Sequence, residues 1–452
     1  MKRRLPTVAG MTEDQARAGR ATGAGEPFTG HARGGRGYRR TVVALFAAGV
    51  ATFAQLYSVQ AVLPALAGGL RVDPARAALG VSVATGALAL SVLGWSALAD
   101  RFGRVRVMAA SVLLASALGL AVPAAGGLGL LLPLRALQGA ALGGLPAVAV
   151  AYVAEEVRAA DVTRAAAAYV SGTTIGGLLG RLVSSAVADV AGWRAGVLAV
   201  GVLGVLASVV FLLVVPPSRG FRRAPRAGRS GPRLRAALAD PGLLALYAQG
   251  LLLMGAFSTV YNVLGFRLLA EPFGVSQTVV GLLFTGYLAG TVSSAVAGRA
   301  AERWGRLPVL LTATAAMAAG VLVTASASLP AVVAGLLLFT AGFFAAHAIA
   351  SGWTGGRART GRAQASALYT LAYYAGSSGL GWAGSAVFTA AGWPAVAGFV
   401  VLLCALALGC ALVLLRSASG RGAGAGWPRS RPRTAAVTSA GCSRPSGEPT
   451  RW

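Results

Sequence analysis

Apolar runs of about 20 residues recur along almost the whole of this 452-residue chain. A helix of that length crosses a hydrocarbon layer roughly 30 Å thick. The composition agrees, because 56% of the residues are hydrophobic and only 12% are charged. A soluble protein of this length would need far more charge on its surface. We therefore predict an all-α protein that crosses a membrane many times, since the short alternating strands of a membrane β-barrel do not occur.

Twelve such runs can be delimited, separated by short segments that contain Gly, Pro or charged residues. The predicted helices cover residues 41–66, 76–99, 105–124, 128–153, 163–190, 195–215, 242–266, 276–299, 307–326, 330–353, 364–390 and 394–415. We expect two six-helix halves, 41–215 and 242–416, joined by a linker at 216–241. The Gly- and Arg-rich segments 1–40 and 417–452 lack helical periodicity and are predicted to be disordered tails.

Arginine dominates the charge of the chain, which has 40 Lys and Arg residues against 13 Asp and Glu residues. Outside the tails, the arginines concentrate in every second loop and in the linker, which carries seven of them. Such alternation favours the cytoplasmic side for those loops. The loop arginines are Arg101, Arg104, Arg106, Arg158, Arg164, Arg303, Arg306, Arg357, Arg359 and Arg362. We therefore predict a multi-pass protein of the cell (inner) membrane with both termini cytoplasmic, and no nucleic-acid partner.

One basic loop occurs twice, once in each predicted half. The first copy is Leu98-Ala-Asp100-Arg101-Phe-Gly103-Arg104, and the second is Ala300-Ala-Glu302-Arg303-Trp-Gly305-Arg306. A shift of 200 positions also lays Tyr169 on Tyr369 and the pair Gly192-Trp193 on Gly392-Trp393. Parallel repeats of this kind predict a substrate site near the middle of the membrane, between the halves.

This loop resembles the signature loop of the major facilitator superfamily, and the resemblance extends over residues 41–416. The superfamily is a class of twelve-helix transporters that work by alternating access. Asp100 is placed to pair with Arg104 or to meet the positive N-terminal end of a neighbouring helix. The resemblance implies that the second contact, made to helix 11, closes the cytoplasmic side. The simpler alternative is that the arginines only set the topology. The candidate gating residues are Asp100, Arg101, Gly103, Arg104, Gly298, Glu302, Arg303, Gly305 and Arg306.

Two further patterns resemble the drug-efflux branch, of the acriflavine-resistance type. Arg135-Ala-Leu-Gln138-Gly139 matches an Arg-x-x-Gln-Gly pattern of that branch in helix 4. The run from Ser171 to Arg181 resembles the antiporter motif of helix 5, although the proline that follows its glycine is absent. These patterns imply export coupled to an opposing proton flow.

Arg135 and Arg181 are the two arginines placed well inside apolar runs. Placing a guanidinium at the centre of a membrane helix costs about 3 kcal/mol on insertion scales. Each of these arginines therefore needs a partner inside the bundle. Each arginine either serves the substrate and coupling or forms a structural pair with backbone carbonyls or with Glu155. Gly172, Gly176 and Gly180 recur every four residues, and this spacing predicts a close helix–helix contact.

Aromatic and amide side chains supply the remaining site candidates. Tyr57 and Gln60 lie in helix 1, Tyr261 in helix 7 and Tyr373 in helix 11, together with Gln138 in helix 4. Apolar walls with a few polar groups suit an amphipathic guest. No acid lies deep inside an apolar run, so His347 is the candidate proton carrier, or else a structural residue.

The sequence therefore predicts a secondary active transporter, an exporter of small amphipathic compounds. The alternatives are a carrier of organic anions or metabolites that uses Arg135 and Arg181, and a membrane sensor without transport. No enzyme activity and no cofactor are expected. The three cysteines suggest neither a disulfide framework nor a metal site. The expected partners are a small-molecule substrate, lipid and protons, and the expected state is a monomer.

Overall fold

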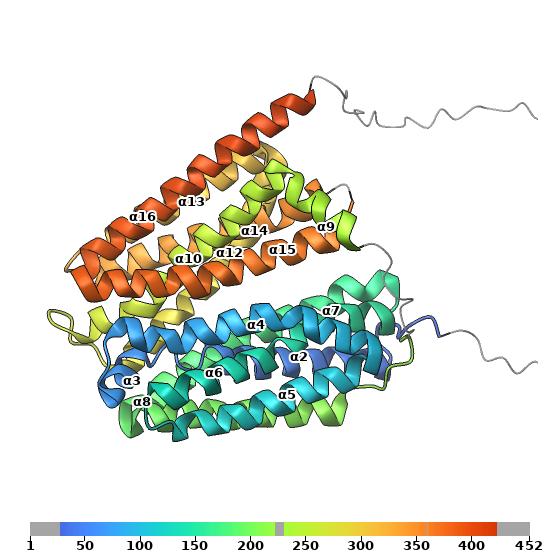
Figure 1. Ribbon diagram of the computed structural model, residues 1–452, viewed down its shortest axis with the longest axis horizontal. Coiled ribbons are helices and arrows are strands. Elements are labelled where there is room, and N and C mark those ends of the chain that lie inside the picture. The colour runs from blue at the N-terminus through green and yellow to red at the C-terminus, as the bar shows by residue number, and fades with distance from the viewer. Residues whose placement is uncertain (1–27, 222–229, 359, 423–452) are drawn as a thin grey trace, which may run out of the picture.

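The computed structural model describes residues 28–221, 230–358 and 360–422, and most of them are helical (Figure 1). Apart from one isolated β-bridge between His31 and Val157, the described residues contain no strand. The first helices are α2 (Arg36–Leu56), α3 (Leu63–Leu70), α4 (Pro74–Phe102), α5 (Arg104–Ala121), α6 (Leu128–Leu142), α7 (Gly144–Glu156) and α8 (Val162–Val214). Later come α9 (Ser230–Ala239), α10 (Pro241–Leu269), α11 (Gln277–Leu282), α12 (Tyr287–Trp304), α13 (Arg306–Val323), α14 (Leu329–Arg357), α15 (Arg362–Ala375) and α16 (Gly381–Gly422).

Nine helices in the described part of the chain are long and apolar enough to cross a membrane. In lipid, a helix satisfies its own backbone hydrogen bonds, which explains why so apolar a chain is helical. Two of the nine contain a non-helical glycine, Gly192 in α8 and Gly392 in α16. Gly196 packs against the carbonyl of Ser184, so the chain folds back after Gly192. The count of twelve spans stays a prediction.

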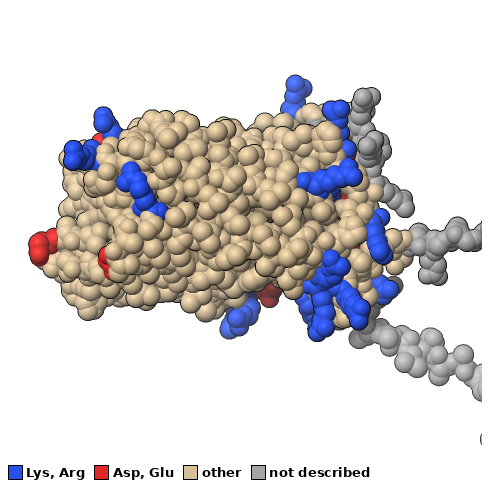
Figure 2. Space-filling model, turned by 90° about the horizontal axis from the view of Figure 1, so that it is seen from below, with Lys and Arg blue, Asp and Glu red and all other residues tan. Residues whose placement is uncertain are grey.

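The elements form two groups, which Figure 1 shows one above the other. The N-terminal group contains α2 to α8, and the C-terminal group contains α9 to α16. We call the end of the bundle with the loops around Gly103 and Gly305 the basic end. In Figure 2, arginines gather at this end, and a mostly uncharged band separates it from the opposite end.

The structure differs from the predicted boundaries near the basic end. Helix α2 begins at Arg36 rather than at residue 41, because the preceding segment is bound: His31 N donates to Glu156 O at 2.7 Å, and Arg158 N donates to His31 O at 3.2 Å. The predicted linker contains helix α9, and α16 continues to Gly422. Three parts of the predicted tails and linker lie outside the described residues: 1–27, 222–229 and 423–452.

The first predicted helix, 41–66, is interrupted in the structure. Between α2 and α3 the chain forms short turns, with Gln60 N donating to Tyr57 O at 3.1 Å and Val62 N to Val59 O at 3.2 Å. The carbonyls of Gln55 and Leu56 accept from the side chain of Arg135, at 3.1 and 2.5 Å, and that of Gln55 also accepts from the Ser58 hydroxyl at 3.0 Å. An arginine from another helix therefore satisfies the end of α2.

The glycines at positions 103 and 305 end equivalent helices with the same backbone conformation. Gly103 has φ 95° and ψ 152°, and Gly305 has φ 89° and ψ 159°. Because this region of φ is unfavourable for other residues, glycine permits the sharp turn into the next helix in both loops. The repeated loop is thus repeated in structure as well as in sequence.

Gly172, Gly176 and Gly180 form the contact between α8 and α2. They lie against the backbone of Phe46, Val50 and Ala54, respectively, so the two helices touch main chain to main chain. A Cβ on Gly176 would lie 2.6 Å from the Val50 Cα and 2.7 Å from its carbonyl oxygen.

We predict that Gly176→Ala lowers the stability of the protein, because the added methyl group would push two rigid backbones apart. Overpacking of this kind typically costs about 1–3 kcal/mol. Thermal unfolding of purified protein in detergent measures the effect. Gly398→Ala is the matched control, since a Cβ there meets no atom within 4 Å. Equal melting temperatures for the two variants would contradict the contact.

Candidate functional site

Arg181 lies on the face of α8 that meets the C-terminal group, and only 3% of its surface is exposed. Its guanidinium donates to Gln60 Oε1 through Nε at 3.0 Å and through Nη2 at 2.6 Å. Nη1 donates to the Gly177 carbonyl, one helical turn earlier, at 2.7 Å. A fork of donors is thus held in one orientation by a single amide oxygen and its own helix.

Three aromatic rings surround this guanidinium. Its central carbon lies 4.2 Å from the ring centre of Tyr57, 4.9 Å from that of Phe284 and 5.0 Å from that of Tyr287. The faces of aromatic rings attract a cation, most strongly where water is excluded. Tyr57 belongs to the N-terminal group, whereas the other two rings belong to the C-terminal group. The rings therefore enclose the cation from both groups.

A short polar chain links the same cation to helix α10. Gln60 accepts from Arg181 through its oxygen and donates through Nε2 to Asn262 Oδ1 at 2.8 Å. The Nδ2 of Asn262 is buried without a hydrogen-bond partner among the described residues. Because buried donors are normally paired, this amide has capacity for another acceptor.

The positive charge of Arg181 is not balanced by a carboxylate. The four ion pairs formed by the described residues involve Arg76, Arg104 and Arg357, but not Arg181. A buried charge without an opposite charge is costly, even where rings and an amide surround it. The arrangement can therefore accept an anionic group.

An aromatic cluster continues from this point through the C-terminal group to His347. The Phe257 ring lies 4.8 Å from that of Tyr261 and 4.0 Å from that of Phe343. The His347 ring lies 5.8 Å from Phe343 and 4.8 Å from Tyr373. His347 Nδ1 and the Tyr369 hydroxyl are 2.9 Å apart. Of the predicted candidates, Tyr57, Gln60, Arg181, Tyr261, Tyr373 and His347 are thus parts of one continuous set of contacts.

Arg135 and Gln138 lie away from this set, inside the N-terminal group. Arg135 is fully buried, and besides the carbonyls that end α2 it binds the Gly80 carbonyl at 2.9 Å and Gln138 Oε1 at 2.5 Å. Gln138 in turn donates to Gln55 Oε1 at 3.3 Å. This geometry favours the structural alternative for Arg135, because its donors are used to fix where α2 stops.

The basic loop of the N-terminal group forms a local ion-pair cluster. Arg104 donates to Asp100 at 2.6 Å and to Glu155 at 2.9 Å, and its guanidinium also lies over the ring of Phe221. Of the two contacts expected for Asp100, the structure shows the pair with Arg104 in its own group. Among the described residues the hydrogen bonds between the two groups include Gln60 with Asn262 and the contacts of Asp189 and Thr389 toward the opposite end, and none of them joins Asp100 to helix 11.

The second copy of the loop is bound differently. Arg303 lies over the ring of its neighbour Trp304 at 5.6 Å, and Arg306 approaches Gly356. Glu302 takes no part in the four ion pairs of the described residues. The backbone of the loop is therefore repeated, but its ion pairing is not.

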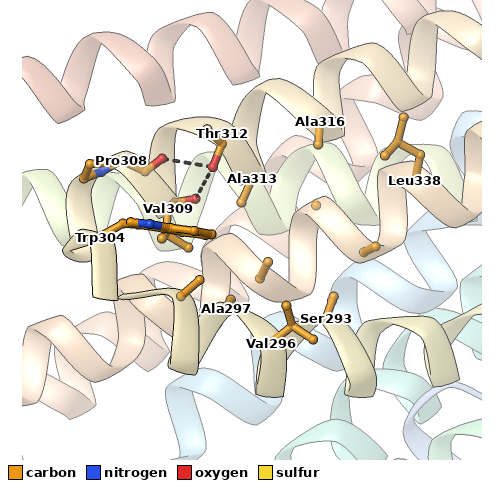
Figure 3. A pocket seen from close by; sticks show the side chains of 14 residues that line it. Ser293, Val296, Ala297, Trp304, Pro308, Val309, Thr312, Ala313, Ala316 and Leu338 are labelled. Atoms are coloured by element: carbon orange, nitrogen blue, oxygen red, sulfur yellow. Dashed lines mark hydrogen bonds between the residues drawn. The ribbon is translucent and has the colours of Figure 1, made fainter. Parts of the chain in front are cut away.

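A cavity of about 570 Å³ opens beside Trp304, between helices α12, α13 and α14 (Figure 3). Its hydroxyl groups bind their own helices: Thr312 donates to Pro308 O at 3.0 Å, and Ser293 donates to Gly290 O at 2.9 Å. Trp304, which lines this cavity, is 64% exposed. The cavity is therefore an apolar crevice on one side of the C-terminal group and does not belong to the site around Arg181.

Three residues of the site were not predicted from the sequence: Phe284, Tyr287 and Asn262. Phe284 and Tyr287 are separated by three positions, and this spacing is the signal that was available. Asn262 directly follows Tyr261, but no pattern marks it. In the described part of the chain, no group of three or more His, Cys, Asp or Glu side chains is arranged to hold a metal ion.

These features define a multi-pass helical membrane protein with a polar site between two helix groups. The sequence matches the family model described as Major Facilitator Superfamily over residues 45–268 and 246–443. This chain therefore belongs to the major facilitator superfamily and is a membrane transporter. It handles a small-molecule substrate in a lipid environment, and the predicted all-α polytopic fold is confirmed.

The similar proteins include transporters of two bacteria. The inner membrane transport protein YnfM of Escherichia coli (strain K12) is 41% identical over 377 residues, which cover 83% of this chain and 90% of that protein. The uncharacterized MFS-type transporter YybF of Bacillus subtilis (strain 168) is 36% identical over 381 residues, covering 84% and 94%. The similar solved structures include that of a bacterial homolog of the human lysosomal transporter Spinster, in an inward-facing and occupied conformation. Its TM-score is 0.68 at 16% sequence identity, and the match covers 87% of this chain and 100% of that chain.

We predict that Arg135→Leu destabilises the fold more than Arg181→Leu does. The first substitution removes a charged donor from three buried backbone carbonyls, of which that of Gln55 also accepts from the Ser58 hydroxyl. The loss of a hydrogen bond to a charged group costs about 1.5–3 kcal/mol. The second chiefly releases one amide oxygen. Thermal unfolding and gel filtration of the two purified variants measure the difference. Equal losses would show that both arginines are structural.

Proposed function

We propose that this transporter carries small amphipathic organic molecules by alternating access and binds them between its two helix groups, beside Arg181. The observation that carries the proposal is the enclosure of this cation by rings from both groups. Mainly apolar walls with a few fixed polar groups are typical of sites for small organic ligands. The rings of Tyr57, Phe284 and Tyr287 supply the walls, and Gln60 and Asn262 supply the polar groups.

We further propose a bacterial inner membrane as the location, with both termini and the linker in the cytoplasm. The alternation of arginines between loops supports this orientation. The Escherichia coli relative is named as an inner membrane transport protein. In this orientation the basic end is cytoplasmic, and the contacts of Asp189 and Thr389 with the other group lie toward the opposite side of the membrane.

Export and proton antiport also belong to the proposal. Their support is the resemblance of the Arg135–Gly139 and Ser171–Arg181 segments to the drug-efflux branch. His347 is the proposed proton site, because it lies among Tyr369, Tyr373 and Phe343 in the cluster that reaches Arg181. A proton on this imidazole would add a second buried cation to the same cluster and would repel the first.

A second candidate substrate class is organic anions. The specific observation in its favour is that, among the described residues, no carboxylate pairs with Arg181 and Asn262 Nδ2 has no hydrogen-bond partner. A guanidinium with a carboxylate forms a strong, directional pair. A substrate with an aromatic body and a carboxylate would satisfy both candidates.

Binding of matched ligand pairs tests the proposal. The purified protein is titrated with aromatic carboxylates and with their neutral amides, and uptake or release is then followed in vesicles. We predict that Arg181→Gln weakens binding of the carboxylate at least about tenfold, as expected for loss of a hydrogen bond to a charged group. The amide should lose less than about threefold.

The control for that experiment is Arg194→Gln, which removes an arginine at the opposite end, where it binds Ala125 O and the ring of Trp193. Equal losses for the carboxylate and the amide would reject the organic-anion candidate. No movement of any solute under any gradient would reject the proposed transport activity.

We also predict that His347→Ala abolishes substrate movement driven by a pH gradient but leaves substrate counterflow intact. Counterflow needs the conformational change but no net proton movement. Tyr369→Phe is the matched control, because it removes the hydroxyl next to His347 without removing the titrating ring. Uptake into vesicles measures both modes. Normal pH-driven transport in His347→Ala would exclude His347 as the proton carrier.

A further inference from the structure

The hydrogen bonds that join the two groups lie toward the end opposite the basic loops. At that end Asp189, near the Gly192 break of α8, reaches the first turn of α11 in the C-terminal group. Its carboxylate accepts from the Thr278 hydroxyl at 2.6 Å and from the backbone N–H groups of Thr278 and Gln277, both at 3.3 Å. A negative charge at the start of a helix meets the positive end of the helix dipole.

The internal repeat produces a second contact of the same design. Position 389 corresponds to position 189 after the shift of 200, and it holds a threonine in place of the aspartate. The Thr389 hydroxyl of α16 accepts from the backbone N–H of Ala75 at 3.2 Å, at the start of α4 in the N-terminal group. Each group therefore places one side chain on the first turn of a helix in the other group.

Asp189 shares one face of α8 with the site. Arg181, Ser185 and Asp189 follow one another at four-residue spacing, which aligns them along a helix. Ser185 donates to the Gln277 carbonyl, and Gln277 Nε2 donates to the Ala61 carbonyl at 2.5 Å. Gln60, the chain neighbour of Ala61, binds Arg181, and the backbone N–H of Gln277 binds Asp189, so these contacts connect the buried cation with the end of the bundle.

We propose that Asp189 and Thr389 are reciprocal caps that hold this end of the transporter shut, and that Asp189 contributes more than Thr389. The proposal rests on the proposed alternating access, for which it supplies the closing contacts. Asp189 dominates because it is charged and accepts three hydrogen bonds, whereas Thr389 accepts one from the other group. Both residues are exposed, so water can replace the caps at modest cost when this end opens.

Distances between spin labels at the two ends test this proposal on the full-length protein. Labels at Ala124 and Ala327 report on the opposite end, since both are exposed and lie in different groups. Labels at Ala160 and Ala363 report on the basic end in the same way. The native cysteines Cys404, Cys410 and Cys442 are first replaced by alanine.

We predict that Asp189→Asn raises the population with a long Ala124–Ala327 distance about two- to fivefold, the range for loss of one charge at an exposed helix start. The Ala160–Ala363 distance should shorten in the same molecules. Thr389→Val, which removes the weaker cap, should change these populations less than about twofold. If Asp189→Asn lowers the yield of folded protein, Thr278→Val removes the shortest bond from the other side and should give the same shift.

Unchanged distances in both Asp189→Asn and Thr278→Val would overturn the proposal. An effect of Thr389→Val as large as that of Asp189→Asn would overturn the dominance of Asp189. The test is independent of substrate. If the distances change in a protein that transports no solute, the proposal about the caps stands and the proposed function is rejected. If the protein transports solute and the distances do not change, the proposed function stands and the proposal about the caps is rejected.

Discussion

A bilayer offers no hydrogen-bond partner to a backbone group or a guanidinium, and the structure depends on this constraint throughout. Each apolar run closes its backbone bonds as a helix. Where a helix must stop inside the bundle, a side chain from another helix satisfies the exposed carbonyls, as Arg135 does at the end of α2. Polar side chains therefore lie where the backbone or a buried charge requires a partner.

Arg135 and Arg181 are both buried, but their need for hydrogen-bond partners is met in different ways. Arg135 is surrounded by backbone carbonyls of its own group and has a structural environment. Arg181 receives one amide oxygen, one carbonyl and three ring faces, two of them from the other group. The first environment is complete within one group, whereas the second is assembled only when the two groups meet. This difference supports Arg181, rather than Arg135, as the residue near the substrate.

Much of the fold was predictable, because the thickness of the bilayer sets the length of an apolar run and because glycines mark the breaks and turns in the sequence. The chain breaks at Gly192 and Gly392 and the turns at Gly103 and Gly305 follow from such signals. The interruption of α2 was not predictable, since its cause lies about 80 residues away in Arg135. The same limit applies to the site: Tyr57, Gln60 and Arg181 carried local signals, but Asn262 is placed by the meeting of two groups. The role of Asp100 also depends on which end of the bundle is joined, which no local pattern records.

The glycine contact between α2 and α8 has a consequence for how the site responds to motion. Because these helices touch main chain to main chain, a rocking motion between the groups would keep Tyr57 and Gln60 with Arg181. Phe284 and Tyr287 belong to the other group. A rocking motion would leave the guanidinium with one ring face and its amide, and would uncover the sides that the other two rings had shielded. Release and capture of a ligand would then be an exchange between a guest molecule and two of the protein's own aromatic faces.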